Sequence, residues 1–169
     1  MQPSGSIDVA ESYYSTIFDR SADEIWNVIR DFNNYPVWVD GAGESQIEGG
    51  KSGDSVGAVR NILYNGSRRW QKLLALSDID RSQTYRFASE PPAHTRNFQA
   101  TLRVTQIVDG NRAFVEWWAT FDCDLDRCEE RIAFFRKAFA GWLESLRRYL
   151  KPAGEANLHS SGLDPAHTV

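Results

Sequence analysis

The stretch from residue 126 to residue 150 reads DRCEERIAFFRKAFAGWLESLRRYL. Asp126 and Glu129 have the spacing of a capping box at its start, and Arg147 and Arg148 place positive charge near its end, where the helix dipole favours cations. About 25 residues at 1.5 Å each would give a helix of roughly 37 Å, long enough to cross a small domain. Its apolar side chains recur every three or four residues, the spacing of one helical face: Ile132, Phe135, Phe139, Trp142, Leu143, Leu146, Tyr149 and Leu150.

The sequence before this helix is typical of antiparallel strands. Asn65-Gly66 is a strong signal for a two-residue hairpin turn, and residues 98–108 and 112–122 are predicted to pair around a turn at residues 109–111. Apolar and polar residues alternate in this last hairpin, so one face of the sheet should be dry and covered by the long helix. The residues predicted to face inward are Phe98, Ala100, Leu102, Val104, Val115, Trp117, Ala119 and Phe121.

Earlier segments complete one domain. Ser21 and Glu24 form a predicted capping box that opens a helix, and a short helical turn should carry Val37 and Trp38. Residues 1–10 are predicted to be a flexible N-terminus, residues 11–151 the folded domain, and residues 152–169 a disordered tail. The remaining predicted strands cover residues 12–19, 44–48, 56–63, the segment from about residue 68, and residues 84–89.

Composition narrows the function classes. Hydrophobic residues make up 41% and charged residues 25%, which is ordinary for a globular protein. The net charge of −4 and the lack of a Lys/Arg run argue against nucleic acid as a partner. We expect no integral membrane segment, because no apolar run approaches 18 residues. The N-terminus shows no secretory signal, so a cytoplasmic location is expected.

Cysteine and histidine suggest no metal site and no cofactor. Cys123 and Cys128 lie five residues apart, and a metal would need further ligands. The three histidines, His94, His159 and His167, lie far from them in sequence. The two cysteines are therefore interpreted as reduced structural thiols. Gly141, inside the long helix, is interpreted as a site of close packing against a strand or the first helices.

Several local sequences resemble one known family. They are residues 21–38 (SADEIWNVIRDFNNYPVW), 57–60 (GAVR), 77–85 (SDIDRSQTY) and 97–100 (NFQA). Together with the order of elements, they make residues 11–150 similar to the polyketide cyclase/dehydrase and lipid transport family of the START-like, or SRPBCC, superfamily. The resemblance implies an α+β helix-grip fold, in which a curved antiparallel β-sheet wraps around the long C-terminal α-helix. It also implies a protein of bacterial type.

Members of this superfamily share a deep cavity between the sheet and the long helix. If Phe98, Ala100 and Trp117 face that cavity, matching positions on the other strands and on the helix should face it too. An alternative is that these side chains simply fill the core. The predicted ligand-binding residues are Arg60, Ile62, Tyr64, Gln71, Leu73, Tyr85, Phe87, Phe98, Ala100, Trp117, Phe135, Phe139 and Leu143.

Arg60 is the most specific candidate for a functional residue, in ligand binding or in catalysis. A buried guanidinium needs an acidic partner or an anionic ligand. Similar plant abscisic acid receptors carry an acid where this chain has Gln71, and a longer gate loop where residues 64–67 form a tight turn, so the hormone-receptor mechanism is not expected. Arg60 could instead pair with a neighbouring carboxylate or lie in water at the rim. Tyr64, Tyr85 and His94 are further catalytic candidates, and His94 could equally be a solvated loop residue.

Three functions remain open from the sequence. The first is a non-catalytic binder of a small hydrophobic molecule, lipid-like or polyketide-like, with an acidic group near Arg60 and Tyr64. The second is a cyclase or dehydratase that uses the same cavity. The third is a protein-interaction module with a filled core. The lack of a convergent Asp/Glu–His set favours the binder over the enzyme.

Overall fold

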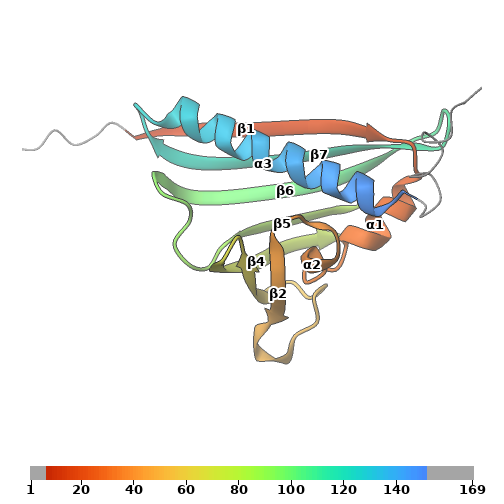
Figure 1. Cartoon of the computed structure of the whole chain (residues 1–169), viewed down its shortest axis with the longest axis horizontal. Helices are drawn as coiled ribbons and strands as arrows, with labels where there is room; N and C mark the ends of the chain where they lie inside the picture. Colours follow the sequence, from red (N-terminus) through yellow and green to blue (C-terminus); the bar gives the residue numbers. More distant parts are fainter. Residues whose placement is uncertain (1–6, 152–169) are drawn as a thin grey trace, which may run out of the picture.

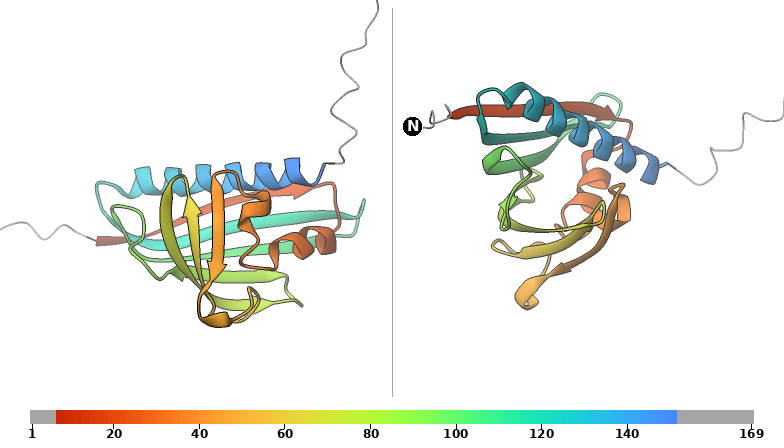
Figure 2. Two further views of the ribbon diagram at one scale, coloured as in Figure 1. Left: turned by 60° about the horizontal axis from the view of Figure 1, so that its bottom comes forward. Right: turned by 60° about the vertical axis from the view of Figure 1, so that its left-hand side comes forward.

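One antiparallel sheet with the strand order β1-β7-β6-β5-β4-β3-β2 dominates the computed structural model, which describes residues 7–151. The sheet curves, and α3 runs along β1 and β7 (Figures 1 and 2). This is the predicted helix-grip α+β fold. The elements are β1 (Ile7–Phe18), α1 (Ala22–Ile29), α2 (Tyr35–Trp38), β2 (Ala42–Ile47), the 3-10 turn η1 (Glu48–Gly50), β3 (Val59–Tyr64), β4 (Ser67–Ser77), β5 (Ser82–Phe87), β6 (Thr95–Ile107), β7 (Arg112–Asp124) and α3 (Cys128–Tyr149).

The predicted register of the last hairpin is confirmed. Leu102 on β6 pairs with Trp117 on β7, and both side chains are fully buried. The next residue, Trp118, lies on the outer face, where the Arg103 guanidinium stands 5.4 Å from its ring centre. Glu116 accepts hydrogen bonds from Arg103 on the same outer face. The alternation of side chains across the pleat therefore places Trp117 beneath α3 and Trp118 outside.

Two predicted local motifs are present. Tyr64 pairs with Ser67 across the Asn65-Gly66 turn, and both turn residues have positive φ, 45° and 79°, as a type I′ hairpin requires. Ser21 and Glu24 form a reciprocal capping box at the start of α1, with bonds of 2.9 and 3.2 Å. Both signals are local in sequence, so they do not depend on the rest of the fold.

Several predicted boundaries were wrong. β1 begins at Ile7, so residues 7–10 belong to the sheet and not to a loose terminus. The cause is pairing with β7, which extends to Asp124 opposite Ile7. α3 begins at Cys128 with Arg127 as its N-cap and no side-chain cap bond, so the expected capping box of Asp126 and Glu129 is absent. The predicted C-terminal tail, residues 152–169, lies outside the described residues.

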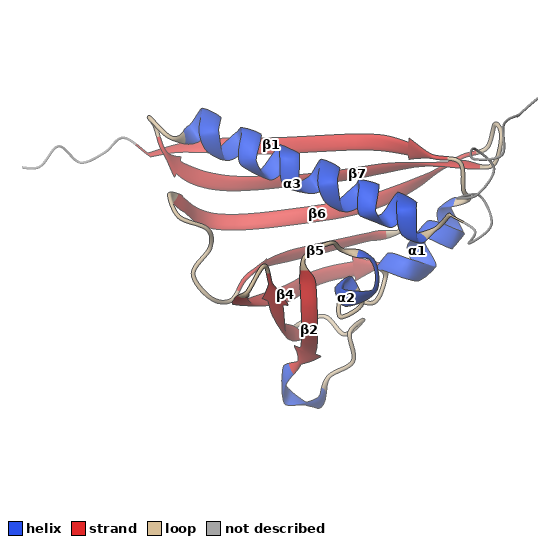
Figure 3. Ribbon diagram, viewed as in Figure 1, coloured by secondary structure: helices blue, strands red, loops and turns tan. Residues whose placement is uncertain are grey.

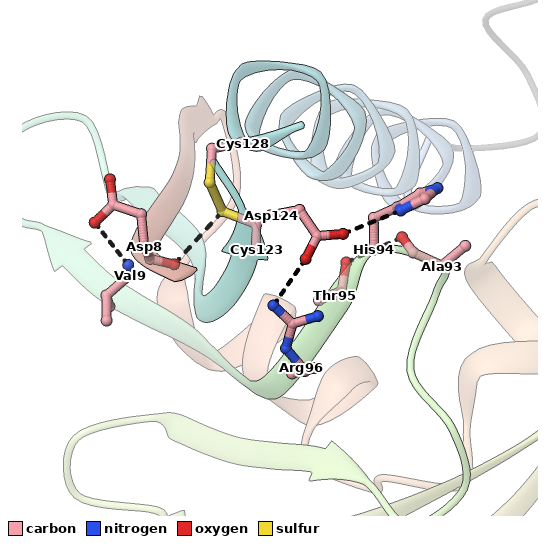
Figure 4. The surroundings of a disulfide bond; sticks show 9 residues. All are labelled: Asp8, Val9, Ala93, His94, Thr95, Arg96, Cys123, Asp124 and Cys128. Carbon is pink, nitrogen blue, oxygen red and sulfur yellow. Dashed lines mark hydrogen bonds and ion pairs between the residues drawn. A yellow bond between two sulfur atoms is a disulfide. The ribbon is translucent and has the colours of Figure 1, made fainter. Parts of the chain in front are cut away.

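Cys123 and Cys128 form a disulfide, which corrects the interpretation of two reduced thiols (Figure 4). Cys123 lies at the end of β7 and Cys128 is the first residue of α3, and the turn between them brings their Cα atoms to 5.4 Å. This separation is within the ordinary range for a disulfide. Disulfides persist mainly in oxidising environments, so the bond weakens the sequence argument for a cytoplasmic location.

Hydrogen bonds from two buried serines hold α3 in place at both ends. Ser12 on β1 donates to the carbonyl of Ile132 at 2.8 Å, and Ser145 donates to the carbonyl of Trp38 at 2.7 Å. α2 lies beside the C-terminal half of α3, while α1 packs against β6 and β7 (Figures 2 and 3). In residues 7–151, no helix is both long and apolar enough to cross a membrane.

Candidate functional site

A cavity of about 630 Å³ lies between α3 and the part of the sheet formed by β3, β4 and β5. It forms there because α3 packs against β1 and β7, while the sheet curves away from the helix toward β3 and β4 (Figure 2). Its walls are mostly aromatic and aliphatic, as in most small-molecule sites. The predicted residues that line it are Arg60, Ile62, Tyr64, Gln71, Tyr85, Phe87, Phe98, Phe135 and Phe139.

The structure places the other four predicted lining residues in the core behind the cavity. Leu73, Ala100, Trp117 and Leu143 are fully buried and do not line the cavity wall. Trp117 shows why, since the ring of Phe139 stacks on it with 5.1 Å between ring centres. A side chain can therefore lie on the inward face of the sheet and still be covered by α3.

Sequence reasoning missed many residues of the cavity wall. Arg69 could have been found, because it precedes Gln71 by two on β4 and must share its face. Tyr35 could not, since it belongs to a single helical turn that shows no periodicity. The missed lining residues are Tyr35, Val39, Asp40, Asn65, Ser67, Arg69, Pro92, Phe134, Lys137, Ala138, Gly141 and Trp142.

Gly141 was expected to pack closely against another element, and the structure contradicts this. A Cβ built at Gly141 would have no heavy atom within 4 Å outside its own helical surroundings. The residue is exposed and lies at the edge of the cavity. Glycine in a helix is less favourable than alanine by up to about 1 kcal/mol, and close packing at Gly141 does not offset this cost. Its lack of a side chain leaves the cavity opening free on this side.

Arg60 is a buried cation with neutral partners. Its side chain is 1% exposed. Nε and Nη2 donate to Gln71 Oε1 at 2.8 and 2.5 Å, and Nη1 donates to the carbonyl of Phe32 at 2.5 Å. The rings of Phe32 and Tyr35 lie 3.9 and 3.6 Å from the guanidinium carbon. In the described part of the chain, no carboxylate lies within ion-pair distance of Arg60, so neither alternative for this residue, pairing with a neighbouring acid or lying in water at the rim, is found.

Tyr35, which contacts Arg60, belongs to a group of buried polar side chains. Among the described residues, Tyr35 Oη, Trp38 Nε1 and Trp117 Nε1 are buried and make no hydrogen bond of good geometry, although the Tyr85 hydroxyl lies near Tyr35 and Trp117. The Tyr35 ring centre lies 5.1 Å from that of Trp38 and 6.1 Å from that of Trp117, so the three form one group. Leaving such groups unsatisfied is unfavourable by about 1–3 kcal/mol each. A ligand oxygen near Tyr35 would relieve part of this cost.

The Tyr85 hydroxyl belongs to the same region of the cavity. Burial raises the pKa of Tyr85 well above its ordinary value, the nearby Tyr35 raises it further, and Arg60 acts in the opposite direction. The net direction is upward, so the phenol stays protonated and neutral. Tyr85 can therefore donate or accept a hydrogen bond, but it is a poor base.

Tyr64 and Trp142 close one wall of the cavity. Trp142 Nε1 on α3 donates to the Tyr64 hydroxyl at 2.8 Å, and the two rings meet edge to face at 5.6 Å. Tyr64 is the last residue of β3, so this contact joins the hairpin to the long helix. The Tyr64 hydroxyl already accepts one bond and keeps its own proton for donation.

His94 is not part of the cavity. Its ring Nδ1 lies 3.3 Å from Asp124 Oδ2, and Asp124 also accepts a hydrogen bond from Arg96 at 2.9 Å (Figure 4). The His94 side chain is about half exposed. The structure therefore does not bring His94 together with Arg60, Tyr64 and Tyr85. Within residues 7–151, no cluster of three or more His, Cys, Asp or Glu side chains could hold a metal.

Comparison with known families decides the relationship. The profile of the family described as polyketide cyclase/dehydrase and lipid transport matches residues 9–154. The chain belongs to this family. Its START-like, or SRPBCC, architecture agrees with the fold and with the place of the cavity. The family name covers both catalysis and transport, so membership alone does not separate an enzyme from a carrier.

Solved structures give the same result. An uncharacterised protein from Bacillus thuringiensis is 26% identical, with a TM-score of 0.72 over 82% of this chain and 97% of that one. The protein XoxI from Bacillus cereus is also 26% identical, with a TM-score of 0.71 over 82% of this chain and 94% of its own. A protein from Thermobifida fusca, 24% identical with a TM-score of 0.72 over 82% and 92%, shares the fold. No curated protein sequence matches this chain.

Proposed function

We propose that this protein binds a small hydrophobic molecule, lipid-like or polyketide-like, whose acidic or electron-rich oxygen lies beside Arg60. The observation that carries the proposal is a guanidinium that is 1% exposed, lines the cavity and has neutral protein partners. A buried cation gains most from an anionic partner. A hydrogen bond to a charged group contributes about 1.5–3 kcal/mol. The family to which the chain belongs supports a hydrophobic cargo.

The guanidinium retains capacity for a ligand. Arginine has five N–H donors, and the three hydrogen bonds to Gln71 and Phe32 leave two N–H groups. The rings of Phe32 and Tyr35 hold the guanidinium in place through cation–π contact. A carboxylate or enolate could therefore bind without displacing a protein partner, and Tyr35 Oη offers a further donor.

The composition of the cavity wall favours binding over catalysis. Among the described residues, the lining includes no histidine, and Asp40 is its one carboxylate. Arg148 donates to Asp40, which engages that acid in an ion pair. Burial keeps Tyr85 protonated, so it is a poor general base at neutral pH. The cyclase or dehydratase alternative would have to rely on Arg60 and the tyrosine hydroxyls, and an interaction module with a filled core does not fit a cavity of about 630 Å³.

Displacement of a neutral fluorescent probe tests the proposal. N-phenylnaphthylamine is bound to the protein and displaced with decanoic acid or with its methyl ester, which differ in charge but share one chain. We expect the acid to bind more tightly than the ester. Arg60→Met should weaken the acid by about tenfold to a hundredfold, since 1.4 kcal/mol corresponds to a factor of ten. The ester should be nearly unaffected.

A matched control uses an arginine outside the cavity. Arg103→Met removes a guanidinium from the outer face of the same sheet, where Arg103 pairs with Glu116. This variant should bind both molecules as the unmodified protein does. Equal losses of acid and ester in Arg60→Met would assign Arg60 to the fold, and unchanged binding of both would place the ligand elsewhere. Absence of probe binding in the unmodified protein would overturn the proposal.

A further inference from the structure

Arg69 is a second cation on the inward face of the sheet. It pairs with Ile62 across β3 and β4, and Ile62 is buried and lines the cavity. Arg69 is half-buried, lines the same cavity, and has no side-chain hydrogen bond or ion pair within residues 7–151. Its neighbour Arg68 points to the opposite face and bonds Glu44 at 2.7 Å. Of two adjacent arginines, the outward one therefore has an acidic partner and the inward one has none.

Lys137 adds a third positive charge to the cavity, from the helix side. It lies on one stripe of α3 with Phe134 and Gly141, three residues before and four residues after it. All three line the cavity and are exposed, so they lie at its opening. Lys137 also has no ion pair among the described residues. The bare Cα of Gly141 leaves the space beside Lys137 open.

The charge of the cavity is opposite to that of the whole chain. Its wall includes three positively charged side chains, Arg60, Arg69 and Lys137, and one negatively charged side chain, Asp40. Asp40 forms an ion pair with Arg148. The whole protein has a formal net charge of −4. A local excess of positive charge in a concave site attracts and retains anions. Arg60 uses three of its N–H groups in hydrogen bonds within the protein, whereas the side chains of Arg69 and Lys137 make no hydrogen bond within the described residues.

We propose that Arg69 and Lys137 form a second anion-binding subsite at the cavity opening, so that the ligand carries an anionic oxygen group at each end of its apolar body. This inference rests on the proposed function, since it assumes that the cavity holds the ligand. Arg60 and Arg69 are diagonal neighbours across β3 and β4, a relationship that separates residues by about 7–8 Å. The inner group binds Arg60, and the outer group binds Arg69 from the sheet and Lys137 from the helix.

Sebacic acid tests the subsite, because it is decanoic acid with a second carboxylate at the far end of the chain. A second carboxylate in an apolar cavity without a partner would weaken binding through lost hydration. We expect sebacic acid to displace N-phenylnaphthylamine about tenfold more effectively than decanoic acid at low ionic strength. Arg69→Met and Lys137→Met should each reduce this preference, and the double variant should abolish it, while the uncharged methyl ester of decanoic acid keeps its affinity.

Arg68→Met is the matched control, since it removes the outward neighbour of Arg69 and should leave the preference for sebacic acid intact. Suppose that decanoic acid binds through Arg60, but that sebacic acid binds no better and does not depend on Arg69. This result would overturn the second subsite alone. Failure of decanoic acid, its ester and sebacic acid to displace the probe would overturn the proposed function and the subsite together. An equal loss for all three ligands in Arg69→Met would assign Arg69 to the fold and overturn the subsite.

Discussion

Arg60 and Gln71 lie directly opposite each other on β3 and β4, and the amide oxygen of Gln71 accepts from both Nε and Nη2 of Arg60. A single neutral oxygen thus accepts both bonds, where a carboxylate could bind the guanidinium with two charged oxygens. The positive charge of Arg60 is therefore held in place without being balanced. The pair therefore leaves one unbalanced positive charge in the buried part of the cavity wall.

Replacement of Gln71 by glutamate should remove the preference for acids. Gln71→Glu keeps the shape of the side chain and supplies the missing negative charge, so Arg60 would be neutralised inside the protein. We expect decanoic acid to bind about tenfold more weakly, while its methyl ester is nearly unaffected. Displacement of N-phenylnaphthylamine measures both. Unchanged affinity for the acid would show that Arg60 does not contact the ligand's charged group.

Gly141 should control access to the cavity. Gly141→Ala should stabilise the protein by up to about 1 kcal/mol, because alanine favours the helix and its Cβ has open space. Gly141→Leu should be equally well folded but should slow probe binding, since its side chain would cover the opening. Urea unfolding measures the first effect and stopped-flow fluorescence the second. Alanine serves as the control for helix propensity, and equal binding rates in both variants would exclude an opening at this residue.

The Cys123–Cys128 disulfide should stabilise the start of α3. A closed loop of this size contributes about 2 kcal/mol by restricting the unfolded chain. Adding dithiothreitol should lower the free energy of unfolding by about that amount. A variant with both cysteines replaced by alanine should be insensitive to the reductant. Two reactive thiols in freshly isolated, denatured protein would show that the bond is absent in the cell and would restore the argument for a reducing compartment.

Asp78 should contribute stability that is lost in acid. Arg30 bonds it at 2.9 Å and Trp26 Nε1 at 2.8 Å, and these hydrogen bonds, that of Arg30 first, lower the pKa of Asp78 to about 2. Because the folded pKa lies below the ordinary value of 3.8, the stabilisation is present above that value and disappears as the pH falls toward 2. Asp78→Asn should therefore lower the urea midpoint slightly near neutral pH.

The difference between Asp78→Asn and the unmodified protein should shrink as the pH is lowered from about 4 toward about 2. Asp109→Asn is a suitable control, because Asp109 is fully exposed and its distance to Arg112 is 3.9 Å. That variant should follow the unmodified protein throughout. A difference for Asp78→Asn that stays constant over this range would mean that its effect comes from packing or local geometry and not from the charged carboxylate.

Local patterns in the sequence determined which segments form strands and helices and which side chains point inward. The alternation in residues 98–121 correctly placed Trp117 inside and Trp118 outside, because successive side chains of a strand must point to opposite faces. The same rule placed Arg60 inward, and it would also have found Arg69. The spacing of Phe135, Phe139 and Leu143 correctly predicted the buried face of α3.

Only the tertiary structure decided which inward side chains face empty space. Trp117 and Phe98 share one face of the sheet, and each packs against α3, Trp117 on Phe139 and Phe98 on Phe135, but of the two only Phe98 lines the cavity. The curvature of the sheet and the position of α3 arise from contacts between residues distant in sequence, so they cannot be predicted from the periodicity of a single segment. The contact of the Tyr35 ring with Arg60 is of this kind. Cys123 and Cys128 are close in sequence, but their spacing alone does not specify the turn between β7 and α3 that brings their sulfur atoms together.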